Sequence, residues 1–302
     1  MPAPRAGARN AQLFAWLADR SGSYQLDLAS ASAIRADAGA RRYFRIVSTG
    51  PHGPTLIAVD APPPEKCHEF QHVSRLLLDA GIHAPRVLDA DFERGFMLIT
   101  DLGRITYLDQ LQSAHLGAAQ RLFIDALHTL IEWQRATRAG ILPDYDKTLL
   151  RRELELFPEW YLQRHLGFTL TPAQRAALDA VYAVLIRNAA AQPHVFTHSD
   201  YMPRNLMVSA PNPGVLDFQD AVTGPLTYDL GRSSAMLLSV GKKISSATAS
   251  AITISMRGKS DCRCVLILNS STVNSNGWAC NGISKFWGYS RGFIIVTERH
   301  II

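Results

Sequence analysis

The stretch 198-HSDYMPRNLM-207, followed closely by 215-VLDFQD-220, constrains the fold of this chain more than any other feature. Pro203 has a fixed φ angle and no amide hydrogen, so the residues around it are predicted to form a loop rather than a regular element. Two short strands are predicted on either side of 209-SAPNP-213, whose five residues suit a hairpin. The polar side chains of this stretch are therefore carried by a loop and a hairpin, where they can converge.

In the predicted register Leu206 lies opposite Leu216, and Asn205 lies opposite Asp217. Directly opposed residues have Cβ atoms about 5 Å apart and point to the same face. An amide oxygen beside a carboxylate suits Mg²⁺, which takes few protein ligands and completes its shell with phosphate and water. Asp200, on the preceding loop, is a separate carboxylate that can accept a proton from an attacking hydroxyl. The pattern predicts phosphoryl transfer from ATP, with Asp200 as catalytic base and Asn205 and Asp217 as magnesium ligands.

Other residues of this region have structural interpretations. His198 is predicted to brace the loop, and Asp229 is predicted to cap or brace a helix start rather than to contact a substrate. For Asn205 and Asp217 the alternative is that both are ordinary polar residues at the end of a hairpin, because short motifs also arise by chance.

Apolar spacing predicts helices over residues 11–19 and 68–79, and strands over residues 55–61, 86–91 and 96–100. The next part of the chain is predicted to be mostly helical. These two patterns, in this order, indicate an α+β fold with a small antiparallel β-rich N-lobe and a larger α-helical C-lobe.

The helices expected in the C-lobe cover residues 116–137 and the apolar stripe over 150–161, and a third begins at Thr171-Pro172. Thr171 is a suitable N-cap, and Pro is favoured at the first helical position. We expect the N-lobe to comprise residues 1–100 and the C-lobe residues 101–231.

The composition is that of a globular protein, with 47% hydrophobic and 19% charged residues. The four cysteines have no spacing typical of zinc sites or disulfide frameworks, so reduced thiols and a cytoplasmic location are expected. No signal peptide and no segment long and apolar enough to span a bilayer is present, so no membrane partner is expected. Nothing in the sequence indicates an oligomeric state.

The spacing H-x-D-x-x-x-x-N, followed by D-F, matches a kinase catalytic loop and metal-binding strand. On these residues the chain resembles the aminoglycoside phosphotransferase/choline kinase family, which implies a bilobal protein-kinase-like fold that uses ATP and Mg²⁺. The likeness covers about residues 10–230. Within the family, the chain most resembles bacterial anomeric kinases of N-acetylmuramate and N-acetylglucosamine. The segments that carry this narrower likeness are 41-RRYFRI-46, 60-DAPP-63, 95-GFMLITDLG-103, 151-RRELELFPEWYLQRHLG-167 and 215-VLDFQDAVTGPLTYDL-230.

The resemblance implies nucleotide-binding residues in a turn and at a hinge of the N-lobe: Gly39, Arg41, Arg42, Thr100, Asp101 and Leu102. The turn would lie over the phosphates, because exposed backbone amides and an arginine favour anions. The hinge would meet adenine through its backbone. The alternatives are an ordinary hairpin turn and a plain strand end.

The sequence departs from general kinases in the third strand, where Asp60 stands near the position at which a Lys is expected. Arg45 or Lys66 are candidates for the missing cation. Glu69 could orient that cation from the neighbouring helix, although a solvated surface Glu is the commoner situation.

For the acceptor, the resemblance implies an amino sugar phosphorylated on its anomeric hydroxyl in cell-wall recycling. The candidate acceptor-binding residues are Glu153, Trp160 and Asp220, because sugar pockets combine an aromatic face with acceptors for hydroxyls. Helix packing is the alternative for Glu153 and Trp160, and a structural hydrogen bond is the alternative for Asp220. Other small alcohols, choline or an aminoglycoside, stay open as acceptors.

The net charge of +5 arises in residues 232–302, which hold nine Lys and Arg residues against two Asp and Glu residues. This tail is Ser-rich and has no helical pattern, so we interpret it as frame-shifted or foreign, with an appended module as the alternative. No nucleic-acid partner is expected, because the tail contains no recognisable module. We expect the tail to be loosely packed and the chain to be a poor or inactive kinase, which leaves a non-catalytic nucleotide-binding protein as the competing interpretation.

Overall fold

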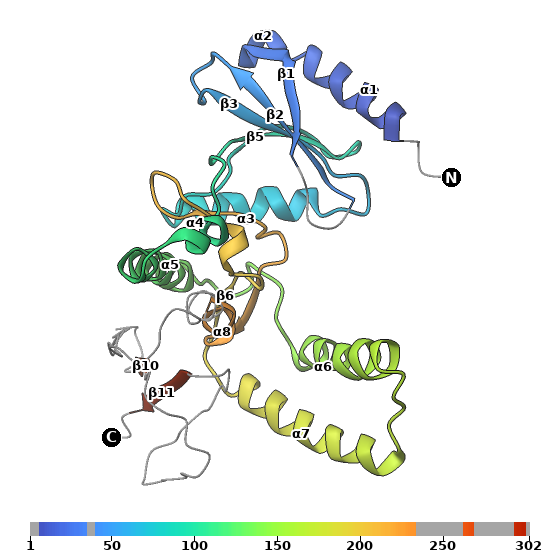
Figure 1. The fold of residues 1–302 in the computed structure, drawn as a ribbon, viewed down its shortest axis with the longest axis vertical. Coiled ribbons are helices and arrows are strands. Elements are labelled where there is room, and N and C mark those ends of the chain that lie inside the picture. The colour runs from blue at the N-terminus through green and yellow to red at the C-terminus, as the bar shows by residue number, and fades with distance from the viewer. Residues whose placement is uncertain (1–5, 35–39, 234–261, 269–292, 300–302) are drawn as a thin grey trace. The chain divides into compact units, whose positions relative to one another are not determined.

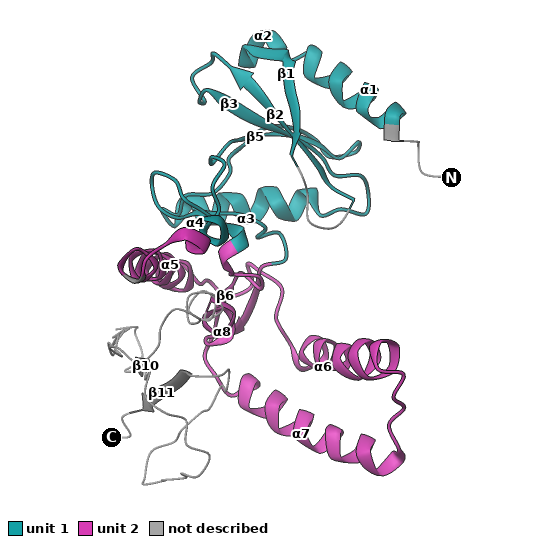
Figure 2. Cartoon of the chain, in the orientation of Figure 1, with its two compact units in different colours: residues 1–110, 204–220 teal, residues 111–203, 221–302 magenta. Residues whose placement is uncertain are grey.

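The structure is a computed structural model that describes residues 6–34, 40–233, 262–268 and 293–299 (Figure 1). Its two compact units are formed by residues 1–110 with 204–220 and by residues 111–203 with 221–302 (Figure 2). This division differs from the predicted lobes, because the segment that carries Asp217 belongs to the first unit.

The first unit contains a five-stranded antiparallel sheet. In spatial order its strands are β1 (Leu26–Ile34), β2 (Arg42–Ser48), β3 (Thr55–Asp60), β5 (Phe96–Thr100) and β4 (Val87–Asp91). The three strands predicted from the sequence are confirmed to within one residue. In the central strand β3, every residue from Leu56 to Asp60 is buried, which agrees with its nearly continuous apolar run.

Three helices of the first unit are α1 (Ala6–Ala18), α2 (Ser21–Tyr24) and α3 (Cys67–Asp79). Helix α1 buries Leu13, Trp16 and Leu17 in one core cluster with residues of the sheet such as Leu98. Helix α3 ends two residues before Gly81, which has a φ angle of +76° that glycine adopts without strain. Both predicted helices of this region are confirmed.

The second unit is mostly helical. Its regular elements from Leu116 to Ser233 are α5 (Leu116–Arg135), α6 (Lys147–Leu156), the π-helix η1 (Phe157–His165), α7 (Pro172–Ala190), β6 (His194–Thr197), β9 (Val222–Pro225) and α8 (Tyr228–Ser233). Helix α4 (Tyr107–Ser113) spans the boundary between the units. The predicted start of α7 is confirmed, because Thr171 and Gln174 form a reciprocal capping box with Pro172 in the first turn.

The predicted helix over residues 150–161 is only partly correct, because its α-helical part ends at Leu156 and a π-helix follows. Pro158 lacks the amide hydrogen that an α-helix needs at this point, which accounts for the change in helical register. Phe157 and Tyr161 are 48% and 51% exposed, whereas Leu150 of the same predicted stripe is buried.

Within residues 232–302, the structure describes Arg232 and Ser233 at the end of α8 and the antiparallel pair β10 (Cys262–Leu268) and β11 (Phe293–Arg299). The remainder lies outside the described residues, so loose packing of this tail stays a prediction. Among the residues that the structure describes, no helix is both long and apolar enough to cross a membrane.

Candidate active site

The hairpin after the catalytic-loop sequence forms, but in a register one residue away from the predicted one. Strands β7 (Leu206–Met207) and β8 (Gly214–Val215) pair Leu206 with Val215 rather than with Leu216. The backbone of Leu216 instead donates to the carbonyl oxygen of Asn205. A shift of one residue would send Asp217 to the opposite face of a regular strand.

Asp217 nevertheless lies beside Asn205, because it has left the strand. Its φ angle is +61°, in the left-handed region that Asp adopts more readily than most residues. The Asn205 Nδ2 atom lies 3.5 Å from Asp217 Oδ2, so the two side chains are adjacent. The predicted pairing of amide and carboxylate is thus present, although the predicted strand register was wrong.

A continuous chain of hydrogen bonds extends from this pair through two neighbouring residues. Gln219 Nε2 donates to Asp217 Oδ1 at 2.8 Å and to Asp220 Oδ2 at 3.4 Å. Lys66 Nζ forms an ion pair of 2.5 Å with Asp220 Oδ1. Asp220 is therefore linked to the Asn205–Asp217 pair through Gln219. Lys66, one candidate for the missing cation, forms its ion pair with Asp220.

Arg41 is the arginine that the structure places in the electrostatic surroundings of Asp217. Its guanidinium forms an ion pair of 2.8 Å with Glu65, and its side chain is 12% exposed. Burial opposes its charge, but a hydrogen bond with Tyr43 and the carboxylates of Glu65 and Asp217 outweigh that effect and raise the pKa of Arg41. Arg41 is thus a charged residue that interacts electrostatically with the predicted magnesium ligand Asp217 and forms its ion pair with Glu65.

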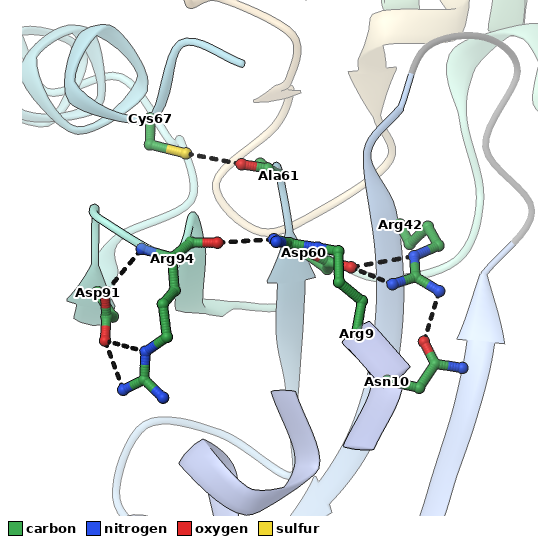
Figure 3. A network of polar contacts seen from close by, with 8 residues as sticks. All are labelled: Arg9, Asn10, Arg42, Asp60, Ala61, Cys67, Asp91 and Arg94. Atoms are coloured by element: carbon green, nitrogen blue, oxygen red, sulfur yellow. Dashed lines mark hydrogen bonds and ion pairs between the residues drawn. The ribbon is translucent and has the colours of Figure 1, made fainter. Parts of the chain in front are cut away.

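Arg42, the adjacent arginine, has a different environment, which Figure 3 shows. The carboxylate of Asp60 is fully buried and forms ion pairs with both Arg9 of α1 and Arg42 of β2. Arg42 also donates to Asn10 at 2.5 Å, and Arg9 donates to the carbonyl oxygen of Arg94 at 2.6 Å. Where general kinases carry a third-strand Lys, this chain has a buried carboxylate that joins α1 to the sheet.

Arg45, the other candidate cation, is held at the predicted hinge. It donates to the Asp101 carboxylate and to the carbonyl oxygen of Gly103, and Thr55 donates to the same carboxylate. Burial raises the pKa of Asp101, but these hydrogen bonds outweigh it and hold that pKa below its usual range. The Asp101 side chain is therefore a structural element of the hinge.

The remaining residues predicted to bind the nucleotide are Thr100, Leu102 and Gly39. The Thr100 hydroxyl accepts from the backbone amide of Arg86. Leu102 is buried, and a Cβ atom at Gly214 would come within 2.8 Å of its side chain, so the glycine permits close packing of the hairpin. Gly39 lies outside the described residues.

In the second unit, the loop that carries Asp200 is braced by Asp229 at the start of α8. The fully buried Asp229 carboxylate accepts backbone hydrogen bonds from His198 at 2.6 Å and from Ser199 at 3.0 Å. Burial raises the pKa of Asp229 to about 7, although the hydrogen bonds from these two donors lower it. His198 Nδ1 accepts from the backbone amide of Asp200 at 3.2 Å. The bracing functions predicted for His198 and Asp229 fit these contacts.

Asp200 itself is paired with Arg232, which the sequence interpretation missed. Arg232 donates to Asp200 Oδ1 at 3.0 Å and to the hydroxyl of Tyr228 at 3.1 Å. The Tyr228 hydroxyl donates to Glu153 at 2.9 Å, and Tyr145 donates to the same oxygen. Glu153 therefore belongs to one hydrogen-bonded group with Asp200.

Trp160 has no described contact with this group. Its side chain is 54% exposed, and the Arg164 guanidinium lies 3.9 Å from its ring centroid. The structure therefore brings Glu153, but not Trp160, into contact with the surroundings of Asp200.

A family model described as "Phosphotransferase enzyme family" matches residues 30–251 of this sequence. The chain belongs to this phosphotransferase family. It is 54% identical over 196 residues to an N-acetylmuramate/N-acetylglucosamine kinase of Pseudomonas aeruginosa, an alignment that covers 65% of this chain and 56% of that protein. A protein of the same name from Pseudomonas putida is 48% identical over 235 residues, with 75% of this chain and 68% of that protein covered.

Solved structures confirm the fold of this chain. The streptomycin–ATP–APH(2″)-IIa ternary complex is similar with a TM-score of 0.52 at 14% identity, covering 80% of this chain and 82% of the other. A choline/ethanolamine kinase family protein from Mesorhizobium loti gives a TM-score of 0.50 at 13% identity, with 74% and 70% covered. The predicted family and the kinase-like α+β fold are both confirmed.

The chemistry of the donors at Asn205 and Asp217 fits magnesium. One amide oxygen and one carboxylate are hard oxygen donors, and Mg²⁺ commonly takes only one or two protein carboxylates. Within the described ranges, no group of three or more His, Cys, Asp and Glu residues could hold a metal ion. Two such ligands would leave most of an octahedral magnesium shell to phosphate oxygens and water.

Proposed function

We propose that this phosphotransferase transfers the γ-phosphoryl group of ATP to the anomeric hydroxyl of an amino sugar, N-acetylmuramate or N-acetylglucosamine. The observation that carries the proposal is the adjacency of Asn205 and Asp217, together with the braced loop that presents Asp200. The names of the Pseudomonas relatives support the choice of acceptor.

In this proposal Asn205 and Asp217 hold Mg²⁺, which would neutralise charge on the β- and γ-phosphates when bound. Arg41 would contact the phosphates, because it is a partly buried cation that interacts electrostatically with Asp217, whereas Arg42 neutralises Asp60 and Arg45 neutralises Asp101. The backbone of the hinge around Asp101 would meet adenine, as the resemblance to the family implies.

The Asp200 carboxylate would accept the proton of the acceptor hydroxyl as that oxygen bonds to the γ-phosphorus and the bond from this phosphorus to the departing ADP oxygen breaks. Arg232 would restrain this carboxylate, because it is ion-paired with Asp200. Glu153, linked to Arg232 through Tyr228, is the acceptor-binding candidate that the contacts support best. The proposed partners are thus a small sugar and ATP, and the proposed location of the reaction is the cytoplasm.

The test is Mg²⁺-dependent ATP consumption with a panel of acceptors: N-acetylglucosamine, N-acetylmuramate, choline and an aminoglycoside. We expect slow consumption with the two amino sugars, because residues 232–302 are predicted to pack loosely, with ³¹P NMR showing a sugar 1-phosphate. Consumption with choline or the aminoglycoside alone would contradict the proposed acceptor. Binding of Mg·ADP without turnover on any acceptor would favour a non-catalytic nucleotide-binding protein.

A further inference from the structure

Gln219 is a buried side chain whose position in the first unit is closely determined. It is 7% exposed and follows Phe218, which is fully buried. The Phe218 ring packs on Phe70 of α3 with 4.7 Å between the ring centroids. This packing leaves the Gln219 amide little freedom to move away from its neighbours.

The orientation of the Gln219 amide follows from its surroundings. Its Nε2 group donates to both Asp217 and Asp220, and a flipped amide would place the carbonyl oxygen Oε1 against two carboxylates. Oε1 is therefore directed away from the acids. Among the residues that the structure describes, this buried oxygen has no hydrogen-bond partner.

A buried acceptor without a partner is destabilising, and such atoms in native proteins usually have a donor that is a protein group, water or ligand. We propose that Gln219 Oε1 accepts a hydrogen bond from an O–H group brought in with the substrates. The donor is either a water molecule on the magnesium ion at Asp217 or a hydroxyl of the acceptor sugar. This inference rests on the proposed function, because both donors belong to the ternary complex.

Gln219→Met tests the inference, because methionine has a similar length but neither donates nor accepts as the amide does. Gln134→Met is the matched control: Gln134 is 6% exposed, and its amide donates to the carbonyl oxygen of Leu226. Calorimetry measures binding of Mg·ADP to each variant, first alone and then with N-acetylglucosamine.

If the donor is a metal-bound water, Gln219→Met should bind Mg·ADP about tenfold more weakly without sugar. If the donor is a sugar hydroxyl, nucleotide binding should be unchanged and sugar binding should weaken by a similar factor. Gln134→Met should bind both ligands like the wild type. Wild-type affinities for both ligands in Gln219→Met would overturn the inference.

A second measurement on the wild-type chain decides the matter if Gln219→Met fails to fold. A crystal structure with Mg·ADP and sugar should show a ligand or metal-shell oxygen within hydrogen-bond distance of Oε1, and an Oε1 atom without such a partner would overturn the inference. Wild type that binds Mg·ADP but phosphorylates no sugar would refute the proposed function alone. Wild type that binds neither ligand would refute both.

Discussion

Replacing Arg41 with methionine should impair a different property of the protein than replacing Arg42, although the two residues are adjacent. Methionine keeps the aliphatic length of the side chain but removes the charge and the donors. Arg41 interacts electrostatically with Asp217, whereas Arg42 is bound to the buried carboxylate of Asp60. The structure therefore predicts a binding defect for the first variant and a folding defect for the second.

The magnitudes follow from the contacts. A hydrogen bond to a charged group contributes about 1.5–3 kcal/mol, so Arg41→Met should weaken Mg·ATP binding by about tenfold to about 150-fold. Its single, part-buried ion pair with Glu65 should contribute less to stability than the ion pair of Arg42 with the fully buried Asp60. Breaking a buried ion pair costs about 3–5 kcal/mol, and Arg42→Met should lie near the lower end because Arg9 still neutralises Asp60.

The assay combines urea denaturation with calorimetric titration of a non-hydrolysable Mg·ATP analogue. Arg41→Met should unfold like the wild type and bind the analogue weakly. Arg42→Met should unfold at lower urea concentration and, where it is folded, bind the analogue normally. A folded Arg42→Met variant with weak binding, together with normal binding by Arg41→Met, would refute the assignment of the two arginines.

Three further predictions concern buried carboxylates and the metal site. Asp217→Ala should weaken both Mg·ATP binding and turnover, and unchanged nucleotide affinity by calorimetry in the presence of magnesium would count against a metal-binding function. Asp60→Asn should lower the free energy of unfolding by about 3 kcal/mol, since it leaves two guanidiniums without their carboxylate, as urea denaturation would show. The pKa of Asp229 is raised from 3.8 to about 7, so its contribution to stability is full below pH 4 and is lost as pH rises to about 7. The wild-type free energy of unfolding, measured relative to Asp229→Asn, should therefore fall by about 4 kcal/mol over this range, and a difference independent of pH would contradict the raised pKa.

The sequence predicted those ends of helices and strands that are determined by neighbouring residues in the chain. The capping residue Thr171 and the glycine at position 81 both act within one helical turn, and both ends appear where the sequence indicated them. The strands of the first unit followed from short runs of apolar residues. The predicted helix over residues 150–161 was too long, because Pro158 lacks an amide hydrogen and so interrupts the α-helical hydrogen bonds within the apolar stripe.

Of the candidate site, only the short motif that contains Asp200, Asn205 and Asp217 could be predicted from the sequence. Asn205 and Asp217 do lie together, but through a left-handed Asp217 that no strand pattern indicates. Arg232 lies 32 residues from Asp200 and Glu65 lies 24 residues from Arg41, so their ion pairs depend on tertiary folding and carry no sequence signature. The missing third-strand Lys was the one signal that pointed to an unusual arrangement of cations.

The most direct test of the account compares nucleotide binding with phosphoryl transfer in Asp200→Asn. Asp200 is proposed to accept a proton and not to hold the metal, so the variant should bind Mg·ATP with nearly wild-type affinity. Rapid-quench measurement of sugar phosphate in a single turnover should then show transfer in the wild type and none above background in the variant. Transfer by Asp200→Asn at the wild-type rate would contradict the central claim that this carboxylate is the catalytic base.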